Sequence, residues 1–249
     1  MKKLIVITAA TCLALGPVDV HALTPKEIIE KIDDAGRVAS SEGMARQIIT
    51  TSGGKKRTLE FKSYSKDRDD KQLVIYTAPK RVEGDKILML NEGDDIWFYT
   101  PKTDRVRHLA SHARRQKVQG SDFAYEDLAG GSIEEDYTYK LLGEEKIDGT
   151  RCYKFELIPT ESGPHYSKLI LWADRETYVT IRIDYYEDGE LLKHLRCYDI
   201  RNIDGHWCAM RLVMTNLQEG GQTVMETLEV RFDIALEDAL FSTLSLKRR

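Results

Sequence analysis

Residues Asp94–Leu128 read DDIWFYTPKTDRVRHLASHARRQKVQGSDFAYEDL. An aromatic run at 96–99 and a basic run at 105–109 flank a turn that begins at Pro101. Aromatic and β-branched residues on both sides of a short turn are typical of a β-hairpin. A basic loop leads on to SDFAYEDL, where Ser121 is suited to begin a short helical turn with Glu126 and Asp127 facing water. We therefore predict a hairpin followed by a cap rich in aromatic side chains.

Period-two alternation of apolar and polar residues extends over most of the chain. Short turns rich in Gly, Asp and Asn separate many of the alternating segments, which predicts antiparallel neighbours. No helical pattern of useful length lies between them, and this argues against βαβ units. The predicted strands are Met44–Thr51, Lys56–Ser65, Lys71–Ala78, Lys86–Asn91, Asp95–Thr100, Arg105–Ala110, Asp136–Leu142, Arg151–Pro159, Tyr166–Ala173, Tyr178–Tyr186, Glu190–Ile200, His206–Asn216 and Thr223–Phe232.

One amphipathic helix is predicted at Thr24–Ala39. Thr24-Pro25-Lys26-Glu27 has the pattern of a capping box with proline at the first helical position. Isoleucines at 28, 29 and 32 then recur at helical spacing and form an apolar stripe. This stripe requires a surface to pack against.

The alternation also indicates how the sheet is shaped. In Tyr178–Tyr186, Val179, Ile181, Ile183 and Tyr185 are predicted to share one face. A single sheet of so many strands must curl or split into two layers. The lone amphipathic helix favours one curved sheet wrapped around a helix over two packed sheets.

The order WFYTP at 97–101, RVRHL at 105–109 and SDFAYEDL at 121–128 resembles the outer-membrane lipoprotein-sorting (LolA-like) family. Ala124 stands where members often have serine. The resemblance implies a mainly β fold with few helices: a single strongly curved antiparallel sheet, an unclosed half-barrel, with an N-terminal helix and a short lid segment covering the concave face. It also implies a periplasmic carrier or chaperone that binds lipid or lipoprotein acyl chains for transfer between envelope membranes. The expected membrane partner is an inner-membrane transporter of the resistance-nodulation-division type.

The N-terminus has the pattern of a secretory signal. Lys2 and Lys3 precede an apolar core at Leu4–Leu15, and Val20-His21-Ala22 forms a small-residue cleavage site. We predict cleavage after Ala22, a single domain over residues 23–249, and a bacterial periplasmic location. The net charge of −4 argues against general nucleic-acid binding, and we expect a monomer.

A strongly curved sheet encloses an apolar groove, in which each buried methylene contributes about 0.8 kcal/mol. The predicted groove-lining residues are large and apolar, and ordinary core packing is the open alternative for each: Leu59, Phe61, Ile75, Met89, Trp97, Tyr99, Ile183, Tyr185, Met214 and Leu228. Phe123 and Tyr125 are predicted to form a lid over the groove, with Phe123 filling the core beneath a loop as the alternative.

The run from Arg105 to Lys117 is the most concentrated positive stretch of the chain. It is suited to dock an anionic lipid headgroup, a bilayer surface or a membrane partner. A solvated edge whose charge prevents aggregation is the alternative. The predicted docking residues are Arg105, Arg107, Arg114, Arg115 and Lys117.

Motifs for catalysis or metal binding are weak. His108 and His112 have i, i+4 spacing, but no Glu sits in a His-Glu-x-x-His frame. Ser63 and Lys66 match Ser-x-x-Lys without its companion motifs. We therefore predict no enzyme activity, no metal and no cofactor. A sensory or regulatory envelope module without carrier activity is the alternative function, and a lipid- or glycan-modifying enzyme would need acidic side chains that converge inside the groove.

Three cysteines remain after the predicted cleavage: Cys152, Cys197 and Cys208. Cys197 and Cys208 flank a predicted turn, so they are candidates to face each other across a hairpin. One disulfide and buried free thiols are both compatible with the sequence.

Overall fold

The computed structural model describes residues 23–129, 131–161 and 163–248, so the predicted signal segment at 1–22 lies outside the described residues. The strands are β1 Ser40–Thr50, β2 Lys56–Lys66, β3 Lys71–Ala78, β4 Lys86–Leu90, β5 Asp95–Thr100, β6 Arg105–Leu109, β7 Tyr137–Ile147, β8 Thr150–Pro159, β9 Lys168–Asp174, β10 Thr180–Glu187, β11 Glu190–Ile203, β12 His206–Asn216 and β13 Gln222–Phe232. The helices are α1 Pro25–Gly36, α2 Tyr125–Leu128 and α3 Ile133–Asp136, with short 3-10 turns η1 Asn91–Gly93, η2 Ser111–Arg115, η3 Val118–Gly120, η4 Asp238–Phe241 and η5 Ser245–Lys247.

All 13 strands belong to one antiparallel, unclosed sheet. Its spatial order is β6-β5-β4-β3-β2-β1-β13-β12-β11-β10-β9-β8-β7. The first six strands run from the middle of the sheet to one edge, and the last seven run from the other edge back to the middle. There β13 pairs with β1, from Ser41 opposite Phe232 to Thr50 opposite Gln222. The predicted half-barrel is confirmed.

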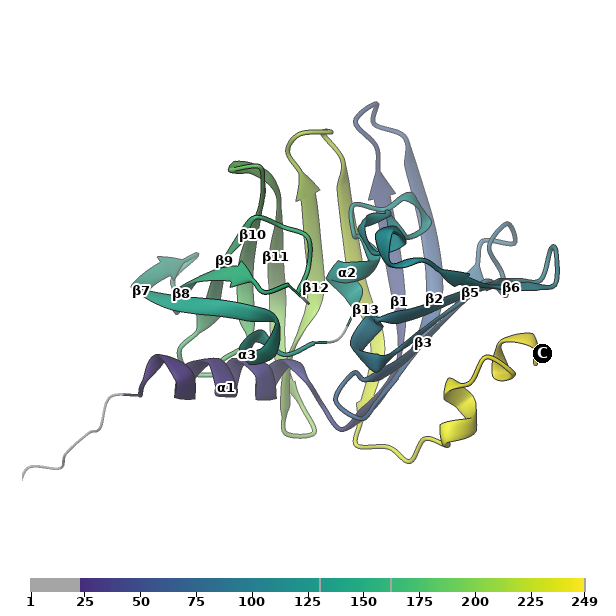
Figure 1. Ribbon diagram of the computed structural model, residues 1–249, viewed down its shortest axis with the longest axis horizontal. Helices are drawn as coiled ribbons and strands as arrows, with labels where there is room; N and C mark the ends of the chain where they lie inside the picture. Colours follow the sequence, from purple (N-terminus) through teal and green to yellow (C-terminus); the bar gives the residue numbers. More distant parts are fainter. Residues whose placement is uncertain (1–22, 130, 162, 249) are drawn as a thin grey trace, which may run out of the picture.

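The connection between β6 and β7 joins the two edges of the sheet. Residues 110–129 of this connection lie on the concave side, which Figure 1 faces. Helix α2 lies in front of the central strands β12 and β13, whereas α1 and α3 lie beside the β7–β9 arm (Figure 1). The C-terminal segment at 233–248 runs along the outside of the arm formed by β3–β6 (Figure 1).

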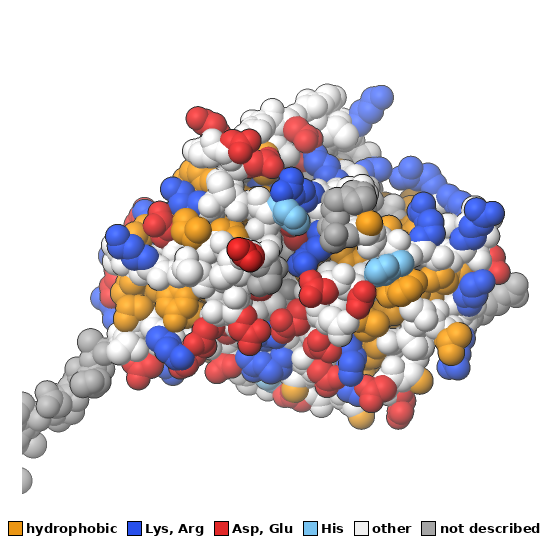
Figure 2. Space-filling model, in the orientation of Figure 1, with side chains coloured by type: hydrophobic (Ala, Val, Ile, Leu, Met, Phe, Trp, Pro, Cys, Tyr) orange, Lys and Arg blue, Asp and Glu red, His pale blue; other side chains and the backbone are white. Residues whose placement is uncertain are grey.

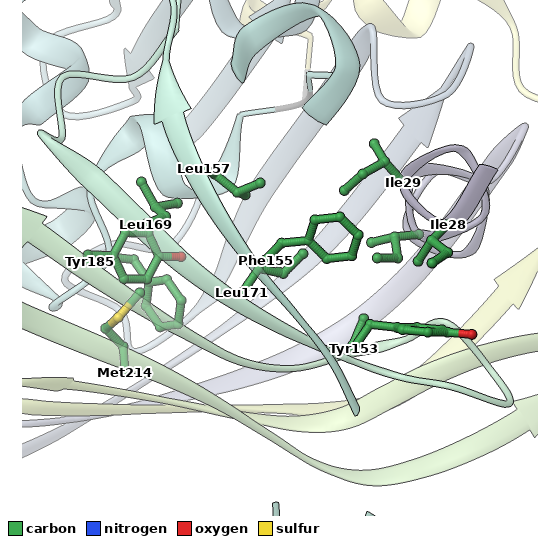
Figure 3. Close-up of a cluster of buried hydrophobic side chains, with 12 residues drawn as sticks. Ile28, Ile29, Tyr153, Phe155, Leu157, Leu169, Leu171, Tyr185 and Met214 are labelled. Carbon is green, nitrogen blue, oxygen red and sulfur yellow. The ribbon is translucent and has the colours of Figure 1, made fainter. Parts of the chain in front are cut away.

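The predicted helix is confirmed, and it ends at Gly36 rather than at residue 39. The capping box is present: Glu27 N donates to Thr24 Oγ1 at 3.3 Å, and Thr24 N donates to the Glu27 carboxylate at 2.7 Å. Ile28 and Ile29 are buried, and they point toward Phe155 and Tyr153 on β8 (Figure 3). The apolar stripe thus packs against the concave face of the sheet.

The concave face carries two apolar clusters. One surrounds α1, and its buried members are Ile28, Ile29, Ile32, Phe123, Tyr153, Phe155, Leu157, Leu169, Leu171, Ala173, Tyr185 and Met214. The other lies on the opposite arm, and its buried members are Ala45, Ile49, Leu59, Phe61, Tyr76, Val82, Ile87, Met89, Ile96, Val118 and Tyr125. Leu128 and Met225 pack against both clusters.

The convex face is apolar in part as well. On one arm Leu73, Leu88 and Tyr99 pack against Phe241 and Leu246 of the C-terminal segment. On the other arm Ile147, Cys152, Ile170, Trp172 and Ile181 form a further buried cluster.

The predicted common face of Val179, Ile181, Ile183 and Tyr185 is wrong at Ile181. The register shifts between Thr180 and Arg182, so Ile181 lies in a bulge. It packs on the convex face, whereas Ile183 and Tyr185 pack on the concave face. A bulge adds one residue and reverses the alternation that precedes it.

The three described cysteines are free thiols. The register of β11 and β12 pairs Cys197 with Leu212 and Cys208 with Arg201, so the two cysteines do not face each other. Burial raises the pKa of the Cys197 thiol to about 12 and that of Cys152 to about 11. Both thiols are therefore protonated and weakly nucleophilic near neutral pH.

Docking of α1 depends on Phe155, whose side chain is fully buried against the helix. We expect Phe155→Ala to lower the free energy of unfolding by about 3–5 kcal/mol, because it leaves a cavity beneath α1. Ile158→Ala on the same strand, where the side chain is 40% exposed, is expected to cost less than about 1 kcal/mol. Urea denaturation followed by circular dichroism measures both, and equal losses would contradict this account of the core.

Candidate ligand-binding cavity

A cavity of about 220 Å³ lies on the concave face of the β1–β4 arm. Its walls are mostly apolar, and Val118, Tyr125 and Leu128 of the segment between β6 and β7 form one of them. The lining residues are Ser41, Gly43, Met44, Ala45, Gln47, Phe61, Ser63, Gln72, Val74, Tyr76, Ile87, Met89, Val118, Tyr125, Leu128, Met225, Thr227, Glu229 and Val230. Opposite it, the α1 half of the concave face is filled by the helix and by Phe123.

The predicted groove-lining residues are divided by the structure among four places. Phe61 and Met89 line the cavity, and Leu59 belongs to the cluster around it. Ile183, Tyr185 and Met214 lie in the other concave cluster, with α1. Ile75, Trp97 and Tyr99 pack on the convex face beneath the C-terminal segment. Leu228 is 40% exposed.

Leu228 lies where the register of β13 shifts against β1, between Thr227 and Glu229, whereas Ile75, Trp97 and Tyr99 are misplaced for another reason. On β3 both Val74 and Ile75 are apolar, and β5 carries four consecutive apolar residues at 96–99. Alternation assigns a face only where polar residues mark the other one. The structure turns Val74, Ile96 and Phe98 inward and their neighbours outward. Other segments of the chain cover both faces of this arm. The local sequence does not show which face turns toward the cavity and which toward the C-terminal segment.

Polar lining residues were missed by the sequence interpretation. Gln47 is 1% exposed, and its side-chain Oε1 has no hydrogen-bond partner among the described residues. Ser63 and Gln72 line the same cavity. A buried acceptor without a donor costs about 1–3 kcal/mol, so the site is incomplete with respect to hydrogen bonding. A polar residue in an alternating strand does not reveal, before the fold is known, that its side chain is buried without a hydrogen-bond partner.

The cover of the cavity consists of residues 116–128. Val118 N donates to Phe123 O at 2.8 Å, which folds this cover segment back on itself. Arg57 on β2 donates to the carbonyl oxygens of Gln119 and Gly120 at 2.6 and 2.8 Å. Thr223 on β13 donates to the Asp122 carboxylate at 2.7 Å. The cover is therefore attached to both arms by polar contacts.

The two predicted lid residues have different positions in this cover. Tyr125 forms part of the cavity wall and is 8% exposed. Phe123 is 1% exposed and fills the α1 half of the concave face. Burial raises the pKa of the Tyr125 phenol, which remains neutral.

Glu126 and Asp127 were predicted to face water, but both side chains are buried. The Asp127 carboxylate lies 2.5 Å from Lys193 Nζ, and the two side chains are 1% and 5% exposed. Tyr166 Oη also donates to Asp127, at 2.6 Å. Glu126 is likewise buried and lies 3.1 Å from His165 Nδ1.

The buried Asp127–Lys193 pair is surrounded by aromatic rings. Lys193 Nζ lies 5.1 and 5.2 Å from the ring centres of Tyr166 and Tyr185. Burial, with Asp127 nearby, raises the pKa of both phenols above their usual range. Asp127 also accepts from Ala124 N at 2.6 Å. The pair thus ties the cover to β11 at a place from which water is excluded.

The predicted docking residues differ in their exposure and in their ion pairs. Arg114 pairs with Asp94 at 2.7 Å, and Lys117 pairs with Glu219 and lies 3.6 Å from Asp122. Arg105, Arg107 and Arg115 are exposed. Arg105 and Arg107 lie on β6, an edge strand of the sheet.

On the face shown in Figure 2, acidic side chains gather below the centre, around α3. Hydrophobic side chains bordered by Lys and Arg lie toward the β5–β6 end (Figure 2). Within the described part of the chain, no three His, Cys, Asp or Glu residues are grouped so as to hold a metal ion. None of the described helices is long and apolar enough to cross a membrane.

The Lys193–Asp127 pair can be tested by a double-mutant cycle. Lys193→Met leaves a buried carboxylate without a partner, so we expect the free energy of unfolding to fall by about 3–5 kcal/mol. Adding Asp127→Asn removes that charge and should recover part of the loss. Lys168→Met, which removes a half-exposed pair with Glu156, is the control and should cost less than about 1 kcal/mol. Additive losses for Lys193 and Asp127 would show that the two side chains do not act as a pair.

Comparison with known proteins identifies the family. A family model described only as "-like: Uncharacterized protein" matches residues 68–248. No curated protein sequence matches the chain.

Among solved structures, a DUF1329 family protein from Desulfovibrio piger is 30% identical with a TM-score of 0.83, over 88% of this chain and 96% of that one. A putative outer membrane lipoprotein-sorting protein domain from Vibrio parahaemolyticus is 29% identical with a TM-score of 0.82, over 89% and 97%. A LolA superfamily protein from Nitrosomonas europaea is 25% identical with a TM-score of 0.75, over 90% and 100%. The chain therefore belongs to the DUF1329 family, and it is similar in sequence and fold to a lipoprotein-sorting domain and to a LolA superfamily protein.

Proposed function

We propose that this protein is a periplasmic carrier that binds the acyl chain of a lipid or lipoprotein in the concave cavity and transfers it between envelope membranes. The observation that carries the proposal is an apolar cavity beneath a cover segment, on a fold shared with a lipoprotein-sorting domain. The proposed role is binding and release, without a chemical step. The predicted secretory signal and the lipoprotein-sorting relatives support a periplasmic location.

The size of the cavity supports a cover that moves. Typical ligand sites measure about 300–1,000 Å³, whereas this cavity measures about 220 Å³. We propose that a complete acyl chain gains the additional space by displacing part of the 116–128 segment. Met44, Met89 and Met225 line the cavity and suit such a change, because the flexible thioether side chain repacks easily.

The polar lining supports a cargo that has a hydrogen-bond donor beside its acyl chain. Gln47 Oε1 is buried and without a partner among the described residues. The amide of an acylated peptide or a hydroxyl of a lipid headgroup would supply the missing donor. Binding of such a cargo gains this hydrogen bond as well as the transfer of methylene groups out of water.

We further propose that the β6 edge docks a membrane partner, an inner-membrane transporter of the resistance-nodulation-division type. Arg105 and Arg107 are exposed on β6, Arg115 is exposed in the turn η2 that follows it, and Arg107 lies 5.5 Å from the ring centre of Phe98. An edge strand offers unpaired backbone groups, and the guanidinium groups favour an acidic partner.

The carrier function can be tested with two neighbouring residues of β3. Val74 lines the concave cavity, whereas Ile75 faces the convex side. We expect Val74→Glu to reduce uptake of a fluorescent diacyl phospholipid at least about tenfold, because a charge is introduced into an apolar site. Ile75→Glu, with the same change on the same strand, should retain uptake. Equal uptake by both folded variants and the wild type would exclude the concave cavity as the site.

The docking surface can be tested by charge reversal. We expect Arg105→Glu with Arg107→Glu to weaken retention of the protein on inner-membrane vesicles at low salt, since the attraction is electrostatic. Lys140→Glu with Lys146→Glu on β7, the opposite edge strand, is the control with the same change in net charge. Phospholipid uptake should be unchanged in both double variants. Similar retention of the two would exclude the β6 edge as the docking surface.

A further inference from the structure

The convex face of the β3–β6 arm is covered by the C-terminal segment at 233–248. Phe241 and Leu246 of this segment are buried, and they pack against Leu73, Leu88 and Tyr99 of the sheet. Lys66 Nζ holds the start of the segment, donating to Leu236 O at 2.9 Å and to Asp238 at 2.8 Å. The segment is therefore attached at its two ends and in between.

A second cavity, of about 640 Å³, lies between this segment and the sheet. Leu73, Ile75 and Tyr99 form its floor, and Leu240 and Pro101 belong to its walls. The volume falls within the range of about 300–1,000 Å³ that is usual for small-molecule sites. It is larger than the concave cavity, and the two lie on opposite faces of β3, since Val74 lines one and Ile75 the other.

Positive charge is concentrated at one end of this convex cavity. Lys86, Lys247 and Arg248 line it, with Glu237 as the acidic residue of the wall. Lys86 is half-buried, and its Nζ donates to the carbonyl oxygens of Arg248 at 2.7 Å and Ser245 at 3.3 Å.

Lys86 has an incomplete electrostatic environment. Among the described residues it forms no ion pair with a carboxylate; its Nζ contacts carbonyl oxygens and lies 5.8 Å from the centre of the Tyr99 ring. Burial lowers the pKa of Lys86, as expected for an ammonium group that has lost part of its contact with water. Lys247, by contrast, lies 3.5 Å from Asp104. An anion beside Lys86 would supply the missing charge.

We propose that the convex cavity is a second binding site, and that it takes a single-chain amphiphile with an anionic head group. The acyl chain lies along Leu73, Ile75 and Tyr99, and the head group lies beside Lys86 and Lys247. This site goes beyond the carrier function of the concave cavity, because it uses the other face of the sheet and a different cover. Occupancy joins the C-terminal segment to the sheet through the ligand.

The test uses the mature full-length chain and palmitate below its aggregation concentration. We expect Val74→Glu, with the concave cavity blocked, to bind palmitate with one-to-one stoichiometry by isothermal titration calorimetry. Adding Ile75→Glu should abolish this binding. Absence of palmitate binding to folded Val74→Glu, or unchanged binding after Ile75→Glu is added, would overturn the proposal. Diacyl phospholipid uptake by wild type and Ile75→Glu reports separately on the carrier function, so the two proposals can fail independently.

Lys86→Met tests the head group, in the Val74→Glu background. We expect palmitate affinity to fall at least about tenfold, while the uncharged ester methyl palmitate binds as before. An equal loss for both ligands would show that Lys86 acts only by holding the C-terminal segment, and would overturn the assignment of the head group. Lysophosphatidylglycerol in place of palmitate shows whether a phosphate is accepted as well as a carboxylate.

Discussion

The arrangement of the whole molecule depends on one connection that joins opposite edges of a single sheet. Because β6 and β7 are the two edge strands, the chain between them connects opposite sides of the molecule. Residues 116–128 of this connection cover the concave side, where Val118, Phe123 and Tyr125 join its apolar clusters. The sequence then determines how the cover is attached: Arg57 and Thr223 hold its outer turn, and the buried Asp127–Lys193 pair holds its inner end.

The two halves of the concave face differ in the side chains that fill them. Helix α1 inserts Ile28, Ile29 and Ile32 into one half, and Phe123 from the crossing segment completes the packing there. The other half receives only Val118, Tyr125 and Leu128 from the cover, and a cavity remains. One half of the concave face is therefore closely packed, whereas the other retains a space that an apolar ligand can enter.

Much of the fold was predictable, because alternation and turn residues are local signals. The predicted bounds of β3, β5 and β12 agree with the structure at both ends. The site was predictable only in part, for two physical reasons. Consecutive apolar residues such as Val74 and Ile75 do not reveal their faces, and the bulge at Ile181 reverses the pattern without a sequence signal. The burial of Asp127 depends on Lys193, which is 66 positions away in the sequence and gives no local sign of the pairing.

The pairing of β1 with β13 also has a consequence for the order in which the sheet is completed during folding. A chain made from its N-terminus completes β1 about as early as any element, yet the strand that covers its free edge is the last of the sheet. Until β13 arrives, β1 presents a row of unpaired backbone groups, which is a template for association with other chains. Contacts of such long sequence separation also make folding slow. A sheet that closes slowly leaves this edge exposed for longer, so association between chains competes with folding until β13 pairs with β1.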